Sequence, residues 1–345
     1  MVKDNFFGPA IAIVVKFSDP MNSANLQILP APPSLVKSLT AGFDAISNHA
    51  GLILLPIMLD LLIWVGPRLR VDYLMEPLLV QMQQMPEAQD PQMLQGFREI
   101  AQGLNLLSVL RTLPVGLPSL VAGRQLSAWA GGPALTWQTP NFLTALLVWA
   151  VLMLFGLACG ALYFSLVGQA ALLDRVNLRL VFSRWFWSFG QVLLLAVTWI
   201  ILGLAVLMPF SCFFSLLAMG GLGGGQLSAL GMLLGGALFI WLILPFAFSP
   251  HGIFVYGLDF RLSILRSLRV TRATFWSTSL FWLSALVLSE GLDILWNVPV
   301  DTSWFLLVGI AGHAFVTTAL LAASFIYYRD ANRWVQGLLE RSQSA

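Results

Sequence analysis

The chain has 345 residues, of which 58% are hydrophobic and only 10% are charged. Soluble domains carry about 25% charged residues, so this composition excludes an ordinary soluble protein and predicts a surface that largely faces lipid. The net charge of +2, with basic residues beside apolar runs, argues against a nucleic-acid partner. The two cysteines lack CxxC or Cys/His spacing, so we predict no disulfide framework, no metal site and no cofactor.

Residues 1–33 are predicted to form a flexible N-terminal tail. The apolar run at 6–15 is too short to span a bilayer. It is not followed by a small-residue cleavage site, which argues against a secretory signal. We therefore interpret it as an interfacial segment, or as sequence upstream of a true start at Met21.

Residues 34–66 are predicted to form a surface helix and a first span. The surface helix carries apolar residues at helical spacing, namely Leu35, Leu39, Phe43 and Ile46. The span runs from about residue 50 to residue 65, is short, and contains Asp60. Gly66 and Pro67 end it.

Residues 67–140 form the only long polar section. Periodic apolar residues predict two or three amphipathic helices, broken at Pro86, Pro91 and Pro114. The apolar stretch 113–130 is expected to lie on the membrane surface. We therefore predict an external helical cap.

Residues 141–329 are predicted to form a five-span bundle, followed by a cytoplasmic tail at 330–345. The expected spans are 142–166, 187–209, 227–248, 276–296 and 304–328, each of bilayer length. The pairs Gly156/Gly160 and Gly231/Gly235 are small-xxx-small pairs that favour close helix packing. The predicted fold class is an all-α integral membrane protein with six transmembrane helices, cytoplasmic amphipathic helices and an external helical cap.

Most Lys and Arg residues fall on the side of the two termini, which predicts that both termini are cytoplasmic. Four of them, Arg261, Arg266, Arg269 and Arg272, share one arc of a predicted helix. Such a basic face suits a helix on an anionic inner leaflet. The alternative is that these residues only determine topology.

A candidate intramembrane polar site comprises Asp60, Glu290, Asp293, His313 and Thr317. Ionisable residues at membrane depth usually face a bundle interior or a wet cavity, so a proton or cation path is one interpretation. The alternative for Asp60 is a pair with Arg68 or Arg70 near the outer interface. For His313 and Thr317 the alternative is ordinary hydrogen bonding between helices, with close approach at Gly309 and Gly312. For Glu290 and Asp293 the alternative is an ordinary helix end that is exposed to water at the external loop.

No Walker, GxSxG or HExxH motif is present. The sequence therefore predicts a non-catalytic membrane protein, not an enzyme, that acts as an accessory, scaffold or assembly factor. The alternative is a permease coupled to protons or cations through the acidic residues and His313. A lipid-active enzyme would need a clustered acid–base pair or metal ligands. The expected partner is the lipid bilayer, including anionic inner-leaflet lipids, and a protein partner is left open.

Two stretches resemble known proteins. The run Arg261-Leu-Ser-Ile-Leu-Arg-Ser-Leu-Arg-Val-Thr-Arg-Ala-Thr-Phe-Trp276 is similar to a basic helix preceding a span in a broad group of bacterial membrane proteins. That group includes the membrane domain attached to some glycerophosphodiester phosphodiesterases. Residues 54–68 resemble membrane proteins of filamentous green bacteria. The resemblance implies a multi-span fold in a bacterial plasma membrane. It implies no catalytic residue, because nothing here matches the phosphodiesterase barrel.

Overall fold

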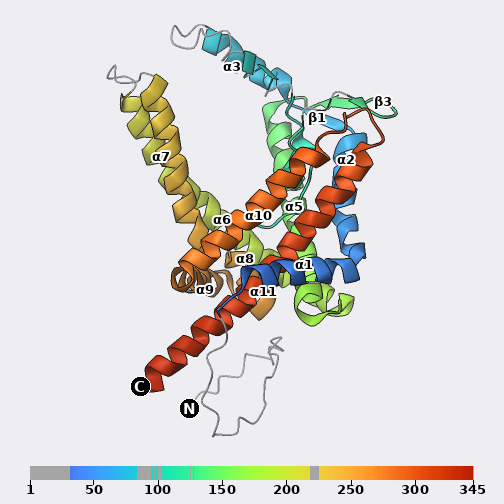
Figure 1. Ribbon diagram of the computed structural model, residues 1–345. Coiled ribbons are helices and arrows are strands. Elements are labelled where there is room, and N and C mark those ends of the chain that lie inside the picture. The colour runs from blue at the N-terminus through green and yellow to red at the C-terminus, as the bar shows by residue number, and fades with distance from the viewer. Residues whose placement is uncertain are drawn as a thin grey trace, which may run out of the picture. The chain divides into compact units, whose positions relative to one another are not determined.

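The computed structural model describes residues 32–83, 95–96, 98–99, 103–124, 126, 128–217 and 225–344. Nearly all of the predicted tail at 1–33 and the predicted helix breaks at Pro86 and Pro91 lie outside these residues. Helices dominate the described chain, and its strands are few and short (Figure 1).

Five described helical segments are long and apolar enough to cross a membrane. They are Phe142–Leu173, Leu178–Phe213, Leu233–Tyr256, Phe275–Trp296 and Leu306–Ser342. A sixth is reached if the bent pair Leu35–Asn48 and Ala50–Val65 counts as one span. The protein is therefore an all-α membrane protein with five or six candidate spans.

The chain divides into two compact units, which are described separately below. The first comprises the described residues of Met1–Ser38, Phe186–Phe281 and Ser324–Ala345. The second comprises the described residues of Leu39–Trp185 and Trp282–Ala323. Helices α1, α6, α10 and α11 contribute residues to both units.

The long helices extend beyond several predicted spans. Helix α5 (Phe142–Leu173) and helix α10 (Phe275–Trp296) begin at or next to the predicted residues. Helix α6 (Leu178–Leu217) begins well before residue 187 and continues past Pro209. Helix α11 (Leu306–Ser344) continues through most of the segment predicted as a tail. Hydropathy ends where apolar residues end, whereas a helix ends where its backbone is capped or broken, which explains the difference.

In the first unit, the predicted span at 227–248 is divided. Helix α7 (Gly225–Ile243) leads into a short 3₁₀ turn, η5 (Leu244–Phe246), and then helix α8 (Ser249–Tyr256). Proline falls in the first turn of both η5 and α8, where a missing N–H is tolerated. Gly257 then ends α8 in the left-handed conformation that favours glycine.

Helix α9 (Phe260–Ala273) packs on α8 and η5 through small polar residues. Ser263 donates a hydrogen bond to the Ser249 carbonyl, and Ser267 donates one of 2.7 Å to the Pro245 carbonyl. Both carbonyls lie at the helix break, where the regular backbone pattern is interrupted. Gly252 permits this approach, because a Cβ there would overlap Ser263.

In the second unit, helix α1 (Leu35–Asn48) meets the next helical pair at a bend of 90°. That pair is η1 (Ala50–Ile53) and α2 (Leu54–Val65). Helix α1 lies close to α11, because a Cβ on Gly42 would meet Ala319 and Ala323. Helix α2, with 12 residues, is about 18 Å long at 1.5 Å per residue, less than the ~30 Å bilayer core.

The section at 67–140 contains short strands as well as helices, and its described residues 95–96 and 98–99 are helical. Its described part contains helix α3 (Asp72–Gln83), the 3₁₀ turn η3 (Leu106–Leu110) and four short strands. Strand β1 (Arg68–Arg70) pairs in parallel with β4 (Thr136–Gln138). Strand β2 (Ala128–Trp129) pairs in antiparallel with β3 (Gly132–Pro133). The end of α2 and strands β1 and β3 lie together at one end of this unit (Figure 1).

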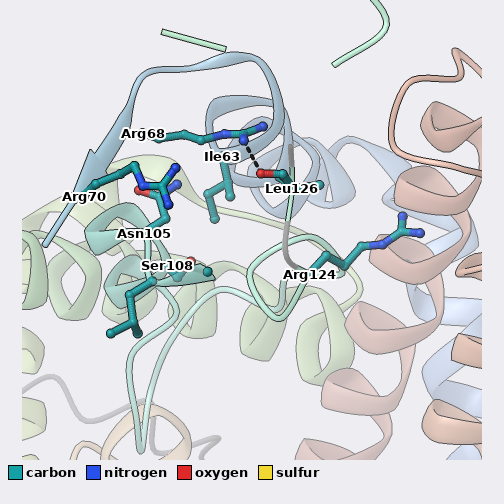
Figure 2. A pocket seen from close by; sticks show the side chains of 9 residues that line it. Ile63, Arg68, Arg70, Asn105, Ser108, Arg124 and Leu126 are labelled. Atoms are coloured by element: carbon teal, nitrogen blue, oxygen red, sulfur yellow. Dashed lines mark hydrogen bonds between the residues drawn. The ribbon is translucent and has the colours of Figure 1, made fainter. Parts of the chain in front are cut away.

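Residues 106–124, here named the re-entrant loop, are partly buried in the second unit. Their largely buried members are Leu107, Leu110, Thr112, Val115, Leu117, Ser119, Leu120 and Val121. The chain descends from Ser108 and returns towards Arg124 (Figure 2). The expectation that residues 113–130 lie on the membrane surface is therefore wrong for Val115, Leu117, Leu120 and Val121, which are buried, whereas Leu113 is 75% exposed.

The glycines of α5 receive this loop. A Cβ on Gly156 would lie 2.7 Å from the Leu110 carbonyl oxygen, and one on Gly160 would lie 2.8 Å from that of Val115. The small-residue pair Gly156/Gly160 therefore accommodates the irregular backbone of the loop, whereas the sequence predicted that it would pack against another helix. Gly160 lies about 27 Å along α5 from Phe142. Because α5 is a candidate span, the loop lies against a segment that is long and apolar enough to cross a membrane.

Candidate functional site

Asp60 binds the returning arm of the re-entrant loop. Its side chain is fully buried on α2. The Ser119 hydroxyl and the Val121 N–H donate to Oδ1, the latter at 3.1 Å, and the Leu120 N–H donates to Oδ2 at 3.1 Å. Irregular backbone at membrane depth is tolerated only where its polar groups are satisfied inside the protein. Asp60 satisfies three such donors at once.

The turn that binds Asp60 is closed by its own hydrogen bonds. The Ser119 hydroxyl accepts from the Ala122 N–H at 3.0 Å while donating to Asp60. The Arg124 N–H donates to the Val121 carbonyl at 3.0 Å. Asp60 is thus hydrogen-bonded to a turn that also has internal hydrogen bonds. The predicted alternative, a pair with Arg68 or Arg70, is not what the structure shows, because the carboxylate is bonded to the loop.

Asp293 and His313 form the second part of the predicted site. His313 Nδ1 lies 2.7 Å from Asp293 Oδ1, which joins α10 to α11. The His313 side chain is almost fully buried, and that of Asp293 is 23% exposed. The close approach predicted at Gly309 and Gly312 occurs, and the contacting residue is Trp296.

Asp60 and His313 interact electrostatically, although no hydrogen bond joins them. Within the described part of the chain, the buried Nε2 of His313 has no hydrogen-bond partner. The second unit therefore brings together three of the five predicted residues: an acid near the surface, a histidine and a buried acid.

The other two predicted residues do not join this group. Glu290 is exposed on α10. Thr317 donates its hydroxyl hydrogen to the His313 carbonyl at 2.7 Å, which is a bond within its own helix. Thr318 is the residue that reaches another helix, since its hydroxyl accepts from Tyr163 of α5 at 2.8 Å.

Polar and aromatic contacts secure the end of this unit that carries the short strands. Trp64 Nε1 donates to the Asp301 carbonyl at 2.8 Å, and the guanidinium of Arg124 pairs with the Asp301 carboxylate at 3.3 Å. Arg124 also donates to the carbonyls of Asn297 and Pro299. Trp64, Trp129 and Trp304 pack edge to face, with centroids 5.8–6.4 Å apart. The loop, the strands and the ends of α2 and α10 are therefore fixed to one another.

Next to this framework lies a basic pocket. It is lined by Ile63, Arg68, Arg70, Gly103, Leu104, Asn105, Ser108, Arg124 and Leu126. Arg70 lies beside Asn105, Arg68 extends over Ile63 towards the Leu126 carbonyl, and Arg124 points away from these two arginines (Figure 2). Asn105 Oδ1 accepts from the Leu69 and Leu107 N–H groups, which joins β1 to η3.

The predicted basic face occupies one side of α9. Arg261, Arg269 and Arg272 are exposed, and Arg266 lies 4.9 Å above the Tyr256 ring. The buried side consists of Ser263, Ser267, Val270 and Thr271. Leu262 and Leu265 are exposed as well. An exposed surface of arginines and leucines is the composition expected of a helix at a membrane interface.

The sequence interpretation missed Ser119 and the Arg68/Arg70 pocket. A signal for the loop was available, because the apolar run between Arg111 and Arg124 contains two prolines and two glycines. Such a run is too short to span and too interrupted to form a helix. His251 was also missed; it is buried in the first unit, 2.7 Å from the Ser324 hydroxyl and beside Phe325.

Within the described residues, no group of three His, Cys, Asp or Glu side chains is placed to hold a metal ion. Comparison with protein families, with curated proteins and with solved structures gives no match to this chain. The fold defines the protein as a multi-span α-helical membrane protein, and its internal geometry carries the functional argument.

Proposed function

We propose that the protein is a non-catalytic accessory, scaffold or assembly factor of a bacterial plasma membrane, with both termini in the cytoplasm. The observation that carries this proposal is the binding of Asp60. Three hydrogen bonds from the re-entrant loop occupy its carboxylate. A relay carboxylate needs a lone pair that can exchange partners, whereas this one holds a loop in place.

The outer end of the second unit supports the same function. Trp64, Arg124 and Asp301 tie the strands and the loop to the span ends. A framework fixed at so many points keeps one shape, which suits the presentation of a surface to other molecules. In the first unit, the exposed arginines and leucines of α9 support contact with anionic inner-leaflet lipids.

The second candidate is a permease coupled to protons or cations. The observation that favours it is the series Asp293, His313 and Asp60. A hydrogen bond joins the first two residues, and electrostatic interaction links the last two. Histidine is the usual side chain for proton exchange near neutral pH, and its buried Nε2 is a free acceptor if Nδ1 donates to Asp293.

One experiment separates the two functions. The purified protein is placed in vesicles that contain a pH-sensitive dye, and an inward proton gradient is applied. The scaffold proposal expects no flux above protein-free vesicles for wild type, Asp60→Asn or His313→Gln. Flux in the wild type that both substitutions abolish, with Glu290→Gln unchanged, would overturn it in favour of the permease.

The proposed orientation has its own test. In a background without Cys159 and Cys212, single cysteines replace exposed Ser342 or exposed Thr136. We expect a membrane-impermeant maleimide to label the Thr136→Cys protein in spheroplasts and the Ser342→Cys protein only after lysis. The reverse pattern would contradict cytoplasmic termini.

A further inference from the structure

Arg68 has unfilled hydrogen-bonding capacity. It follows α2 on strand β1, and its residue surface is only 6% exposed. Its Nη1 donates to the Leu126 carbonyl. Its Nε and Nη2 are buried and have no hydrogen-bond partner in the described chain. Buried polar groups are usually satisfied, and an arginine whose donors point into a pocket indicates a missing acceptor.

The surroundings of Arg68 supply more positive charge. Arg70 lines the same pocket, and none of the lining residues is acidic. The acid whose charge acts on Arg68 is Asp301, which is paired with Arg124. Burial, followed by the charge of Arg70, lowers the pKa of Arg68, and Asp301 opposes this only in part. The guanidinium of Arg68 is therefore buried beside a second arginine, in a region with restricted access to water.

A bound anion would supply the acceptors that Arg68 Nε and Nη2 lack. The guanidinium group presents a planar fork of donors that matches phosphate and carboxylate oxygens. Asn105 retains its Nδ2 as a donor because its Oδ1 accepts from two N–H groups, and Ser108 adds a hydroxyl. We propose that Arg68 and Arg70 bind a phosphate-type oxyanion, either the headgroup phosphate of an anionic lipid or a free phosphate.

The position of the pocket next to the end of α2 favours a binding site at the level of the lipid headgroups. Strand β1 begins three residues after the last residue of α2. Strand β4, its partner, carries Trp137, which is 58% exposed, and Leu135 beside it is 70% exposed. Exposed tryptophan is enriched where a protein passes through a membrane interface. A lipid lying there would place its phosphate near β1.

The test uses the full-length protein, delipidated in a neutral detergent. Calorimetric titration is performed with inorganic phosphate, with short-chain phosphatidylglycerol and with a short-chain uncharged glycolipid. We expect a phosphate-bearing probe to bind and the glycolipid not to bind. Arg70→Gln should weaken binding about tenfold or more, as expected for the loss of a charge-assisted hydrogen bond. Arg111→Gln, at an exposed arginine of the same unit, should change it less than about twofold.

Arg68→Lys keeps the charge but removes the planar fork, so it should weaken binding as well. Arg68→Lys is used together with Arg70→Gln. Arg68→Gln is avoided because it removes the hydrogen bond to the Leu126 carbonyl and endangers folding. Binding of inorganic phosphate and lipid alike supports a free oxyanion site, and binding of the lipid alone supports a headgroup site. Absence of binding by both probes overturns the proposal. So does binding that Arg70→Gln and Arg68→Lys leave unchanged.

Discussion

Asp60 and Arg68 lie on one short stretch of the chain and in one unit, and both are buried charges. Their partners differ. Asp60 accepts three hydrogen bonds from the re-entrant loop, whereas Arg68 makes one bond and leaves two guanidinium nitrogens without a partner. A buried charged group whose hydrogen bonds are satisfied stabilises the fold that surrounds it. A buried charged group whose donors lack acceptors destabilises the fold until a ligand supplies them. Such a group is therefore the better candidate for a ligand-binding residue.

The largest effect on stability is expected at Asp60. Asp60→Ala leaves the Ser119 hydroxyl and two N–H groups without an acceptor. At about 1–3 kcal/mol for each unsatisfied buried group, we expect a loss of about 4 kcal/mol in stability. Thermal unfolding in detergent measures it as a large fall in melting temperature. Glu290→Ala, at the exposed acid of the predicted site, is the control and should change stability by less than about 0.5 kcal/mol.

A steric test addresses the groove of α5 that receives the loop. Gly160→Leu places a side chain against the backbone of Val115 and Gly116, which cannot move aside as a side chain would. Overpacking of this kind costs about 2–3 kcal/mol. Gly203→Leu is the matched control, because a Cβ there meets nothing within 4 Å. Equal melting temperatures for the two variants would show that the loop does not occupy the groove.

A smaller effect is expected at the turn itself. Ser119→Ala removes one donor to Asp60 and the acceptor for Ala122, which should cost about 1–2 kcal/mol. Combined with Asp60→Ala, the two losses should be less than additive, because both substitutions remove the same bond. Ser47→Ala, at an exposed serine bonded within its own helix, is the control. Strict additivity in the double variant would contradict the Ser119–Asp60 bond.

The smallest effect is expected at the partly exposed acid. Asp293→Asn keeps a hydrogen bond to His313 but removes the charge, so we expect a loss of about 0.5–1 kcal/mol in stability. Asp60→Ala should exceed it severalfold. A loss at Asp293 as large as that at Asp60 would show that the α10–α11 pair, and not the loop, is the main polar anchor of the unit.

The sequence predicts the membrane class and several helix boundaries well, because both depend on local composition. Phe142 begins α5 as predicted, and α10 ends at Trp296 as predicted. It also singles out Asp60, since a lone carboxylate in an apolar run is conspicuous in any sequence.

The partners of Asp60 could not be predicted in the same way. Two of the three are backbone N–H groups of Leu120 and Val121, which lie about 60 residues away and have no side-chain signature. The third is the hydroxyl of Ser119, in the same distant segment. Periodicity assigns faces to helices and strands, but it does not place an irregular segment. The apolar residues of the loop therefore suggested a membrane surface, although most of them pack inside the protein. The Arg68/Arg70 pocket was missed for the same reason, because β1 meets Asn105 and Ser108 only through the tertiary fold.

Hydrogen–deuterium exchange of the peptide covering residues 117–123, in lipid nanodiscs, tests the central claim most directly. The claim is that Asp60 holds the re-entrant loop inside the second unit. In the wild type we expect the Leu120 and Val121 amides to exchange slowly, and residues 130–135, which are partly exposed, to exchange fast. In Asp60→Asn the protection of the loop should be lost while α5 remains protected. Fast exchange of the loop in the wild type, or protection that Asp60→Asn leaves intact, would contradict the claim.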